Sequence, residues 1–357
     1  MKVLEIMGSL HRGGAETMIM NYYRAFDKEK CQMDFVIHDR FENDYYDEAI
    51  SLGAKVIELK TPGTVGAVKY IQNLIEVIQK NGPYDAIHIQ TDYQAFLSVI
   101  AAKFSHIKNI IVHSHNTFFS KRMKFINRIV FSVFSVQRVA CGREAGKAFF
   151  GNKDFIILNN AIDIEKFRKF NEVECKKNKH KIFGDAQVIG HLGRFNKQKN
   201  HDFIIDLAQS LLNTNENIVI ACYGEGEEEV RIKNIVKERG LSNIIFMGVT
   251  NDVVSVYHMF DIFILPSLFE GFPVTLIESQ LTGVYSLTSD KVSHECDLGF
   301  NALKFLPLDV SVWKHEILEY LKSNTKKKNP TIENIDEFDV NVQWKKLYQI
   351  YKGEYSE

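Results

Sequence analysis

Hydrophobic positions in the first third of the chain fall into short apolar runs, separated by longer stretches with helical spacing. The short runs predict strands at residues 3–7, 34–38, 55–59, 85–89 and 109–113. The longer stretches predict helices at residues 15–26, 45–52, 65–79 and 94–104. Short strands that alternate with helices are typical of βαβ units in a parallel sheet.

The same alternation begins again at residue 187. It predicts strands at 187–192, 217–222, 244–247 and 262–265, and helices at 202–212, 227–239, 253–258 and 273–281. Residues 164–185, between the two halves, are rich in lysine and asparagine and poor in apolar residues, so we place a domain boundary there. The pattern predicts an α/β fold with two Rossmann-like, doubly wound domains, 1–163 and 164–338, that face each other across a cleft. Such folds bind ligands at the carboxyl ends of their strands.

Residues 342–351 are apolar at helical spacing, with four large side chains on one face: Trp344, Leu347, Tyr348 and Tyr351. An apolar stripe of this kind needs a partner surface. We expect the C-terminal helix, 339–357, to pack back on the first domain.

Composition narrows the class of protein. The 357 residues are 45% hydrophobic and 25% charged with a net charge of −1, which excludes a disordered chain, a collagen and a polyanion-binding protein. The five cysteines form no CxxC pair, which favours a reducing compartment over a structural zinc site. No run of 18 apolar residues occurs and the first apolar run is too short for a signal peptide, so we expect a cytoplasmic protein.

Two glutamates, Glu270 and Glu278, lie eight residues apart directly after the strand predicted at 262–265. Pro273 between them suits the first position of a helix, whose free backbone N–H groups can hold a diphosphate. Glu278 could accept hydrogen bonds from a ribose, and Glu270 could face a sugar hydroxyl. The alternative is a strand–turn–helix whose glutamates only complement the helix dipole.

This motif resembles the E-x7-E motif of retaining glycosyltransferases of family 4, which have the GT-B fold, and the chain is most similar to capsular and exopolysaccharide members. The likeness extends from Gly13-Gly14-Ala15-Glu16 to Ser289-Asp290. It implies an acceptor-side first domain and a second domain that binds a nucleotide sugar. The implied reaction moves a hexose-type sugar from a nucleoside diphosphate donor, UDP-linked, to a lipid-linked oligosaccharide, in cell-surface polysaccharide synthesis.

A basic loop, residues 193–200, follows the strand predicted at 187–192. Cations there would stabilise the charge that develops on the leaving diphosphate. The resemblance assigns this role to Arg194 and Lys199, with Lys197 as a less suitable partner. Because no two aspartates are spaced as DxD, we expect neither a required metal nor a cofactor. The alternative is a solvated basic loop.

The resemblance implies further contacts in the first domain. Adjacent glycines permit positive φ and close approach to a ligand, and Gly13 and Gly14 match the loop that lies over the donor phosphates. His115 matches a histidine near the reacting face of the sugar, and His113 is the alternative. A second histidine is often found at position 90, which holds Gln90 here, so a purely structural role for His88 stays open.

The complete expected site has two overlapping sets. The catalytic set is His115, Arg194, Lys199 and Glu270. The donor-binding set is Gly13, Gly14, Arg194, Lys199, Val253, Glu270, Gly271, Phe272, Pro273, Val274, Thr275 and Glu278, with Val253 and its neighbours Asn251 and Asp252 near the base. The family's Pro-Asn-Gly-Ile-Asp block is replaced by Asn159-Asn160-Ala161-Ile162-Asp163, which puts the hinge geometry in doubt.

Positive charge is concentrated in residues 101–153, which hold ten Lys or Arg and one acidic residue, for a net charge of +9. Within this segment, four cations and one aromatic residue lie close together in the sequence: Lys121, Arg122, Lys124, Phe125 and Arg128. The mixture is typical of a helix on an anionic membrane surface, where it could also meet the acceptor. The alternative is a core helix with a solvated basic edge. Since no nucleic-acid-binding motif accompanies the charge, we expect no nucleic-acid partner.

Two other functions remain compatible with this architecture. A nucleotide-sugar epimerase would consume the donor without an acceptor. A non-catalytic, nucleotide-binding partner subunit would tolerate loss of Glu270 or Arg194.

Overall fold

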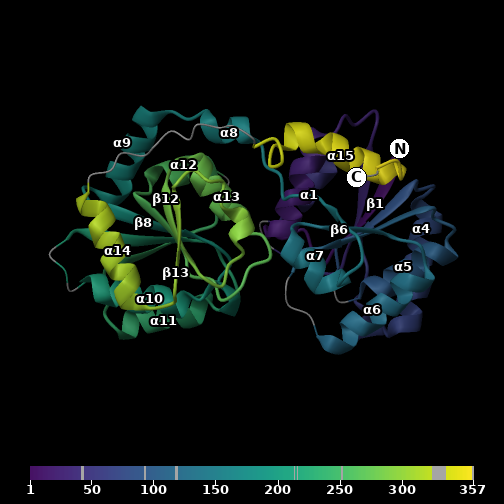
Figure 1. The fold of residues 1–357 in the computed structure, drawn as a ribbon, viewed down its shortest axis with the longest axis horizontal. Coiled ribbons are helices and arrows are strands. Elements are labelled where there is room, and N and C mark those ends of the chain that lie inside the picture. The colour runs from purple at the N-terminus through teal and green to yellow at the C-terminus, as the bar shows by residue number, and fades with distance from the viewer. Residues whose placement is uncertain are drawn as a thin grey trace. The chain divides into compact units, whose positions relative to one another are not determined.

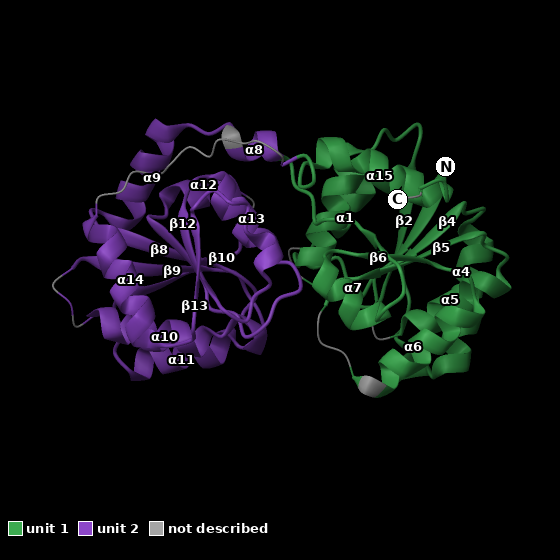
Figure 2. Ribbon diagram, viewed as in Figure 1, with its two compact units in different colours: residues 1–163, 336–357 green, residues 164–335 purple. Residues whose placement is uncertain are grey.

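The computed structural model describes residues 1–41, 44–91, 94–116, 120–212, 214, 216–250, 252–323 and 335–355. The chain forms two compact units: unit 1 contains residues 1–163 and 336–357, and unit 2 contains residues 164–335 (Figure 2). Each unit holds one parallel sheet with helices on both faces (Figure 1), which confirms the predicted fold class. No helix among the described residues is both long and apolar enough to cross a bilayer.

Unit 1 contains a seven-stranded parallel sheet in the order β3-β2-β1-β4-β5-β6-β7. Its strands are β1 (Lys2–Ile6), β2 (Gln32–Ile37), β3 (Val56–Glu58), β4 (Ala86–Ile89), β5 (Asn109–Ser114), β6 (Gln137–Ala140) and β7 (Ile156–Ile157). Its helices are α1 (Gly14–Ala25), α2 (Tyr46–Ser51), α3 (Pro62–Val65), α4 (Ala67–Asn81), α5 (Ala95–Phe104), α6 (Lys121–Val133), α7 (Arg143–Phe150) and α15 (Val340–Lys352).

The sheet of unit 1 is buried on both faces, which explains why its central strands are almost continuously apolar. The core on one face includes residues of α1 and α15, and the core on the other includes residues of α4 and α5. Helix α15 lies along α1 (Figure 1), where the ring of Phe26 stacks on Tyr351 at 6.1 Å and meets Trp344 at 5.8 Å. The end of the chain therefore completes the core of unit 1.

Unit 2 contains a six-stranded parallel sheet in the order β10-β9-β8-β11-β12-β13. Its strands are β8 (Gln187–Leu192), β9 (Ile218–Tyr223), β10 (Ile244–Gly248), β11 (Ile262–Leu265), β12 (Tyr285–Ser289) and β13 (Leu303–Leu306). Its helices are α8 (Ile164–Arg168), α9 (Glu172–Phe183), α10 (His201–Leu212), α11 (Glu229–Glu238), α12 (Val253–Met259), α13 (Val274–Leu281) and α14 (Val310–Lys322). Helices α9, α12 and α13 lie on one side of the sheet, and α10, α11 and α14 on the other (Figure 1).

The strands at one edge of each sheet, β6 and β7 in unit 1 and β12 and β13 in unit 2, were missing from the predicted pattern. Strand β12 has the sequence Tyr-Ser-Leu-Thr-Ser, and its serine and threonine side chains are fully buried. Hydrogen bonds to the backbone satisfy these hydroxyl groups in the core. Thr288 donates to the carbonyl oxygen of Leu265 at 3.0 Å, and Ser286 donates to that of Val284 at 3.1 Å. Hydropathy alone does not identify such a strand, because hydrogen bonds rather than apolar contacts compensate its burial.

The strand order reverses between β1 and β4 in unit 1 and between β8 and β11 in unit 2. In open α/β sheets, ligands bind outside the carboxyl ends of the strands at this reversal. The loop after β1 carries Gly13, the loop after β8 carries Arg194, and the loop after β11 carries Glu270. Three of the predicted site residues therefore follow strands at the reversal points of their own sheets.

Candidate active site

The carboxylate of Glu270 is the centre of a polar cluster in unit 2. Its Oε1 accepts hydrogen bonds from Lys199 Nζ at 2.6 Å and from Ser267 Oγ at 2.7 Å, and its Oε2 accepts one from Gln198 Nε2 at 3.1 Å. The Glu270 side chain is 9% exposed and that of Lys199 is 16% exposed, so water screens the ion pair weakly. The structure thus brings two predicted residues together and adds Gln198 and Ser267, which sequence patterns did not single out.

Two hydrogen bonds hold the basic loop against the loop after β11. The backbone N–H of Leu268 donates to the carbonyl oxygen of Gln198 at 2.9 Å, and Asn200 Nδ2 donates to that of Pro266 at 3.1 Å. Asn200 adopts a left-handed conformation with φ of 57°, which asparagine tolerates better than most residues. Lys199 therefore belongs to a short, capped turn whose position is determined by the neighbouring strand.

Glycines bring a third loop onto the basic loop. Gly224 has φ of 133°, and a Cβ atom there would clash with the carbonyl oxygen of Gly193. The same loop supplies Glu227, whose carboxylate lies 3.1 Å from the guanidinium of Arg194. Arg194 follows the end of β8, and its side chain is 40% exposed although it pairs with Glu227.

Glu278 lies on α13, and only 8% of the residue is exposed. Tyr257 donates a hydrogen bond from its hydroxyl to Glu278 Oε2 at 2.9 Å. Burial raises the pKa of Glu278 to about 7, while the bond from Tyr257 and the charge of Lys166 oppose that shift. The protonated and the ionised form of Glu278 therefore both occur near neutral pH.

The N-terminus of α13 follows Pro273, which caps the helix with φ of −77° rather than occupying its first helical position. The first backbone N–H groups of an α-helix lack intrahelical acceptors and can bind an anion. Gly271, Phe272, Val274 and Thr275 make up the rest of this turn. Val253 opens α12, which Asp252 caps by accepting from Ser255 N–H, while Asn251 lies outside the described residues.

The glycine pair in unit 1 lies at the start of α1. Gly13 caps α1 in an extended conformation with φ of −107°, and Gly14 is the first helical residue, so neither uses the positive φ that glycine permits. A Cβ atom on Gly13 would lie 2.5 Å from Glu16 Oε2. A side chain at position 13 would therefore displace the Glu16 carboxylate, which folds back over the helix start.

The two histidines that end β5 occupy different environments. His113 is fully buried, and its Nδ1 lies 3.2 Å from His88 Nε2. His115 lies one residue beyond the strand and is partly exposed, with its Nε2 2.5 Å from Gln90 Oε1. Burial lowers the pKa of both His113 and His115, to about 3 for His115, so both rings are neutral near pH 7.

Helix α6 presents an apolar stripe to solvent among the predicted cations. Phe125, Ile129 and Val133 are 67%, 48% and 70% exposed, and their four-residue spacing places them on one face. Arg122 and Arg128 are exposed, Lys124 is half-buried, and the side chain of Lys121 lies outside the described part of the chain. An exposed stripe of this kind is unusual for a helix whose apolar residues serve only a core.

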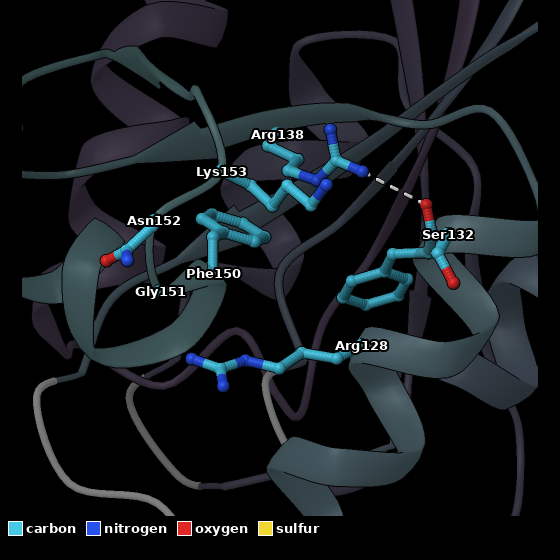
Figure 3. Close-up of a pocket in the computed structure, with 8 residues that line it drawn as sticks. Arg128, Ser132, Arg138, Phe150, Gly151, Asn152 and Lys153 are labelled. Atoms are coloured by element: carbon cyan, nitrogen blue, oxygen red, sulfur yellow. Dashed lines mark hydrogen bonds between the residues drawn. The ribbon is translucent and has the colours of Figure 1, made fainter.

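A basic pocket of about 450 Å³ adjoins the end of α6. Arg128, Arg138 and Lys153 line it together with the rings of Phe131 and Phe150. Figure 3 shows Phe150 between Arg128 on one side and Arg138 with Lys153 on the other. Arg138 donates to the carbonyl oxygen of Phe131 at 3.0 Å, which anchors one wall of the pocket.

Comparison with known proteins identifies the family. A model of the group 1 glycosyl transferases matches residues 172–335, and a model of Glycosyltransferase Family 4 matches residues 12–148. EpsF of Bacillus subtilis (strain 168) is 32% identical over 337 residues, which cover 88% of this chain and 86% of EpsF. The chain belongs to glycosyltransferase family 4.

More distant relatives of this family 4 glycosyltransferase cover most of its length. CapH of Staphylococcus aureus, a capsular polysaccharide biosynthesis glycosyltransferase, is 24% identical over 366 residues and covers 98% of each chain. An Escherichia coli UDP-Gal:alpha-D-GlcNAc-diphosphoundecaprenol alpha-1,3-galactosyltransferase is 23% identical over 304 residues, which cover 79% of this chain and 78% of that enzyme.

Solved structures agree with the observed architecture. A crystal structure of HepE from Anabaena in complex with UDP-glucose superposes with a TM-score of 0.81 at 17% identity, covering 98% of this chain and 99% of HepE. The predicted family and GT-B fold are therefore confirmed, and the protein is a glycosyltransferase.

Proposed function

We propose that this glycosyltransferase moves a sugar from a UDP-linked donor to a lipid-linked oligosaccharide during synthesis of a cell-surface polysaccharide, with retention of configuration. The observation that carries the proposal is the cluster of Lys199, Gln198 and Ser267 around Glu270, beside the strand reversal in unit 2. The complex of HepE with UDP-glucose and the diphosphoundecaprenol acceptor named for the Escherichia coli relative support the two substrate classes.

In this proposal, Arg194 and Lys199 stabilise the diphosphate leaving group. Lysine has three N–H donors, of which Lys199 directs one to Glu270, so the others can reach phosphate oxygens. Charge on the diphosphate grows as the glycosidic bond breaks, so fixed cations bind the transition state more tightly than the ground state. The N–H groups at the start of α13 add to the same effect.

Glu270 is poorly suited to act as a covalent nucleophile, because three hydrogen bonds already use its two oxygens. We therefore propose that the acceptor attacks from the face that the leaving group vacates, with the diphosphate assisting removal of the acceptor proton. Glu270 would hold a sugar hydroxyl, Glu278 the ribose, and His115 the reacting face of the sugar. Mass spectrometry of the enzyme with donor alone should reveal no sugar–enzyme adduct; a trapped adduct would refute this mechanism.

We further propose that the two cations replace a divalent metal. The sequence lacks a DxD motif, and Arg194 with Lys199 supplies two positive charges for the two phosphates. Transfer should therefore continue after dialysis against EDTA. Activity that disappears with EDTA and returns with Mn²⁺ or Mg²⁺ would contradict this part of the proposal.

We also propose that the enzyme works in the cytoplasm, at the membrane surface, with α6 in contact with anionic lipid. Each cation near an anionic surface contributes about 1 kcal/mol, and the exposed rings and branched side chains of α6 can enter the interface. The five free cysteines, all buried, are compatible with a reducing compartment.

Vesicle flotation tests the membrane contact. Wild-type protein should float with phosphatidylglycerol vesicles and less with phosphatidylcholine vesicles, and added salt should release it. Phe125→Ser and Arg128→Ala should each reduce flotation. Lys237→Ala, which removes an exposed cation from α11, is the matched control and should leave flotation unchanged. Equal flotation of all variants would exclude α6 as the contact.

The central test measures transfer with a panel of nucleotide sugars and an acceptor carrying a polyprenyl diphosphate. A donor found by thermal shift at about 100 times its dissociation constant should add about 2.7 kcal/mol of stability. Lys199→Ala should lower kcat by about 100-fold to 1,000-fold, by analogy with removal of a single charge-stabilising donor. Lys197→Ala, an exposed cation of the same turn, should have little effect.

The same assay separates the other functions. Conversion of the donor sugar without an acceptor would indicate an epimerase. Unchanged polymer synthesis in cells that carry Glu270→Ala or Arg194→Ala would indicate a non-catalytic partner. Either result would overturn the proposed reaction.

A further inference from the structure

A fully buried carboxylate lies on β1, in a position that the proposed reaction does not use. Glu5 Oε1 accepts a hydrogen bond from the hydroxyl of Tyr351 at 2.7 Å and lies 3.2 Å from His88 Nδ1. Glu5 Oε2 accepts one from Gln90 Nε2 at 3.0 Å. No lysine or arginine pairs with Glu5 within the described ranges. A buried carboxyl group is costly unless hydrogen-bond partners surround it, so the arrangement depends on these neighbours.

The hydrogen bonds continue from Glu5 to the candidate active site of unit 1. Gln90 directly follows β4, and the oxygen of its side-chain amide lies 2.5 Å from His115 Nε2. The other ring nitrogen, His115 Nδ1, is buried and has no hydrogen-bond partner among the described residues. Gln90 therefore joins the buried carboxylate to one side of the His115 ring, and the nitrogen on the other side is left with an unused hydrogen-bonding position.

The chemistry of each group sets the direction of these bonds. Gln90 donates from its NH₂ group to Glu5 Oε2, so the carbonyl oxygen of its amide faces His115. That oxygen only accepts, so His115 must carry its proton on Nε2. The neutral ring then has a lone pair on Nδ1. Because the pKa of His115 is lowered to about 3, protonation near pH 7 does not disturb this assignment.

We propose that Glu5 and Gln90 are positioning residues that hold His115 in the Nε2–H tautomer, so that Nδ1 accepts a hydrogen bond from a hydroxyl of the transferred sugar. The tautomer follows from unit 1 alone. The contact with the sugar rests on the proposed function.

The C-terminal helix is part of the same network. Tyr351 on α15 supplies one of the donors to Glu5, and two further bonds anchor the end of α15 beside the sheet. Asn109 Nδ2 donates to the carbonyl oxygen of Tyr351 at 3.1 Å, and Gln137 Nε2 donates to that of Ile350 at 2.9 Å. The docking of α15 thereby helps to fix the Glu5 side chain, on which the orientation of Gln90 depends.

Nitrogen NMR of the protein labelled with ¹⁵N-histidine tests the tautomer directly. The His115 signals, identified by their loss in His115→Asn, should show a protonated Nε2 and an unprotonated Nδ1 in the wild type. Gln90→Leu removes the acceptor, and Glu5→Gln lets the amide at position 90 turn around. Both should convert His115 to a mixture of tautomers or to Nδ1–H. A wild-type His115 protonated on Nδ1, or a tautomer unchanged in both variants, would overturn the proposal.

Tyr84→Phe is the matched control. It removes a phenol–carboxylate hydrogen bond of 2.7 Å, from Tyr84 to Asp34, in the same unit but outside this network. It should leave the His115 signals and the transfer rate unchanged, whatever it does to stability. Thermal unfolding shows whether each variant is folded, and Glu5→Gln keeps side-chain volume if Gln90→Leu does not fold.

Kinetics tests the contact with the sugar. In both Gln90→Leu and Glu5→Gln, kcat/KM for the donor should fall by about 10-fold to 100-fold, while affinity for free UDP should not change. An altered tautomer with unchanged kcat/KM would overturn the role in transfer. If the wild-type protein transfers no sugar at all, the proposed function fails, and the NMR result still decides whether Glu5 and Gln90 orient His115.

Discussion

Replacing Glu278 with glutamine tests whether this buried carboxyl group titrates near neutral pH. Burial raises its pKa from the ordinary 4.5 to about 7. An acid whose pKa is raised by folding contributes stability that is fully present below pH 4.5 and is lost as the pH rises to about 7. The difference between the two pKa values corresponds to about 3 kcal/mol of the free energy of unfolding.

Glu278→Gln removes the titrating group and keeps nearly the same volume, so Tyr257 can still donate to the amide oxygen. We expect the stability of the variant relative to wild type to increase by about 3 kcal/mol between pH 5 and pH 8.5. For a unit of 172 residues, 164–335, this corresponds to about 6–12 °C in the melting temperature of unit 2.

Differential scanning calorimetry at several pH values measures this effect. Glu238→Gln, which neutralises an exposed glutamate on α11, is the control and should follow the wild-type curve at every pH. The decisive quantity is the difference between the Glu278→Gln and wild-type melting temperatures as a function of pH. If the two curves stay parallel from pH 5 to pH 8.5, Glu278 does not titrate in this range and the argument from burial is wrong.

Three further predictions concern the same structural features. Gly224→Ala should destabilise unit 2 by several kcal/mol and abolish donor binding in calorimetric titrations, since the new Cβ clashes with the neighbouring loop. Gly240 has φ of 64° with open space around it, so Gly240→Ala should lower the free energy of unfolding by only about 1–2 kcal/mol. This variant should bind the donor normally. Leu347→Ala, which truncates a fully buried side chain of α15, should lower the free energy of unfolding of unit 1 by about 2–5 kcal/mol in urea denaturation. Tyr257→Phe removes a hydrogen bond that stabilises the ionised form of Glu278. In the calorimetric series, the pH midpoint set by Glu278 should therefore rise by about 1–2 pH units. An unchanged midpoint would show that Tyr257 does not stabilise the ionised carboxylate.

The local pattern of the sequence determined most of the elements and two candidate loops. Apolar runs separated by amphipathic stretches were sufficient to predict the central strands of both sheets, because buried parallel strands are apolar on both faces. The spacing of Glu270 and Glu278 identified the turn after β11, and the basic loop after β8 supplied Lys199. Each of these signals lies within about a dozen neighbouring residues, which is the range over which periodicity carries information.

Tertiary structure alone decided which side chains meet. Lys199 and Glu270 are 71 residues apart, and Tyr351 and Glu5 are 346 apart, yet each pair shares a hydrogen bond. The pairing of parallel strands brings such positions together, and no local pattern encodes which strands become neighbours.

The same reason explains the predictions that failed. The polar strand β12 was missed because its hydroxyl groups are satisfied by backbone atoms that only the folded sheet supplies. The contact between Gly13 and the folded-back carboxylate of Glu16 likewise became visible only in the folded chain. The sequence thus determined where strands, helices and candidate loops lie, whereas the partners of each buried polar group depended on strand order, because hydrogen bonds require contact in space rather than proximity along the chain.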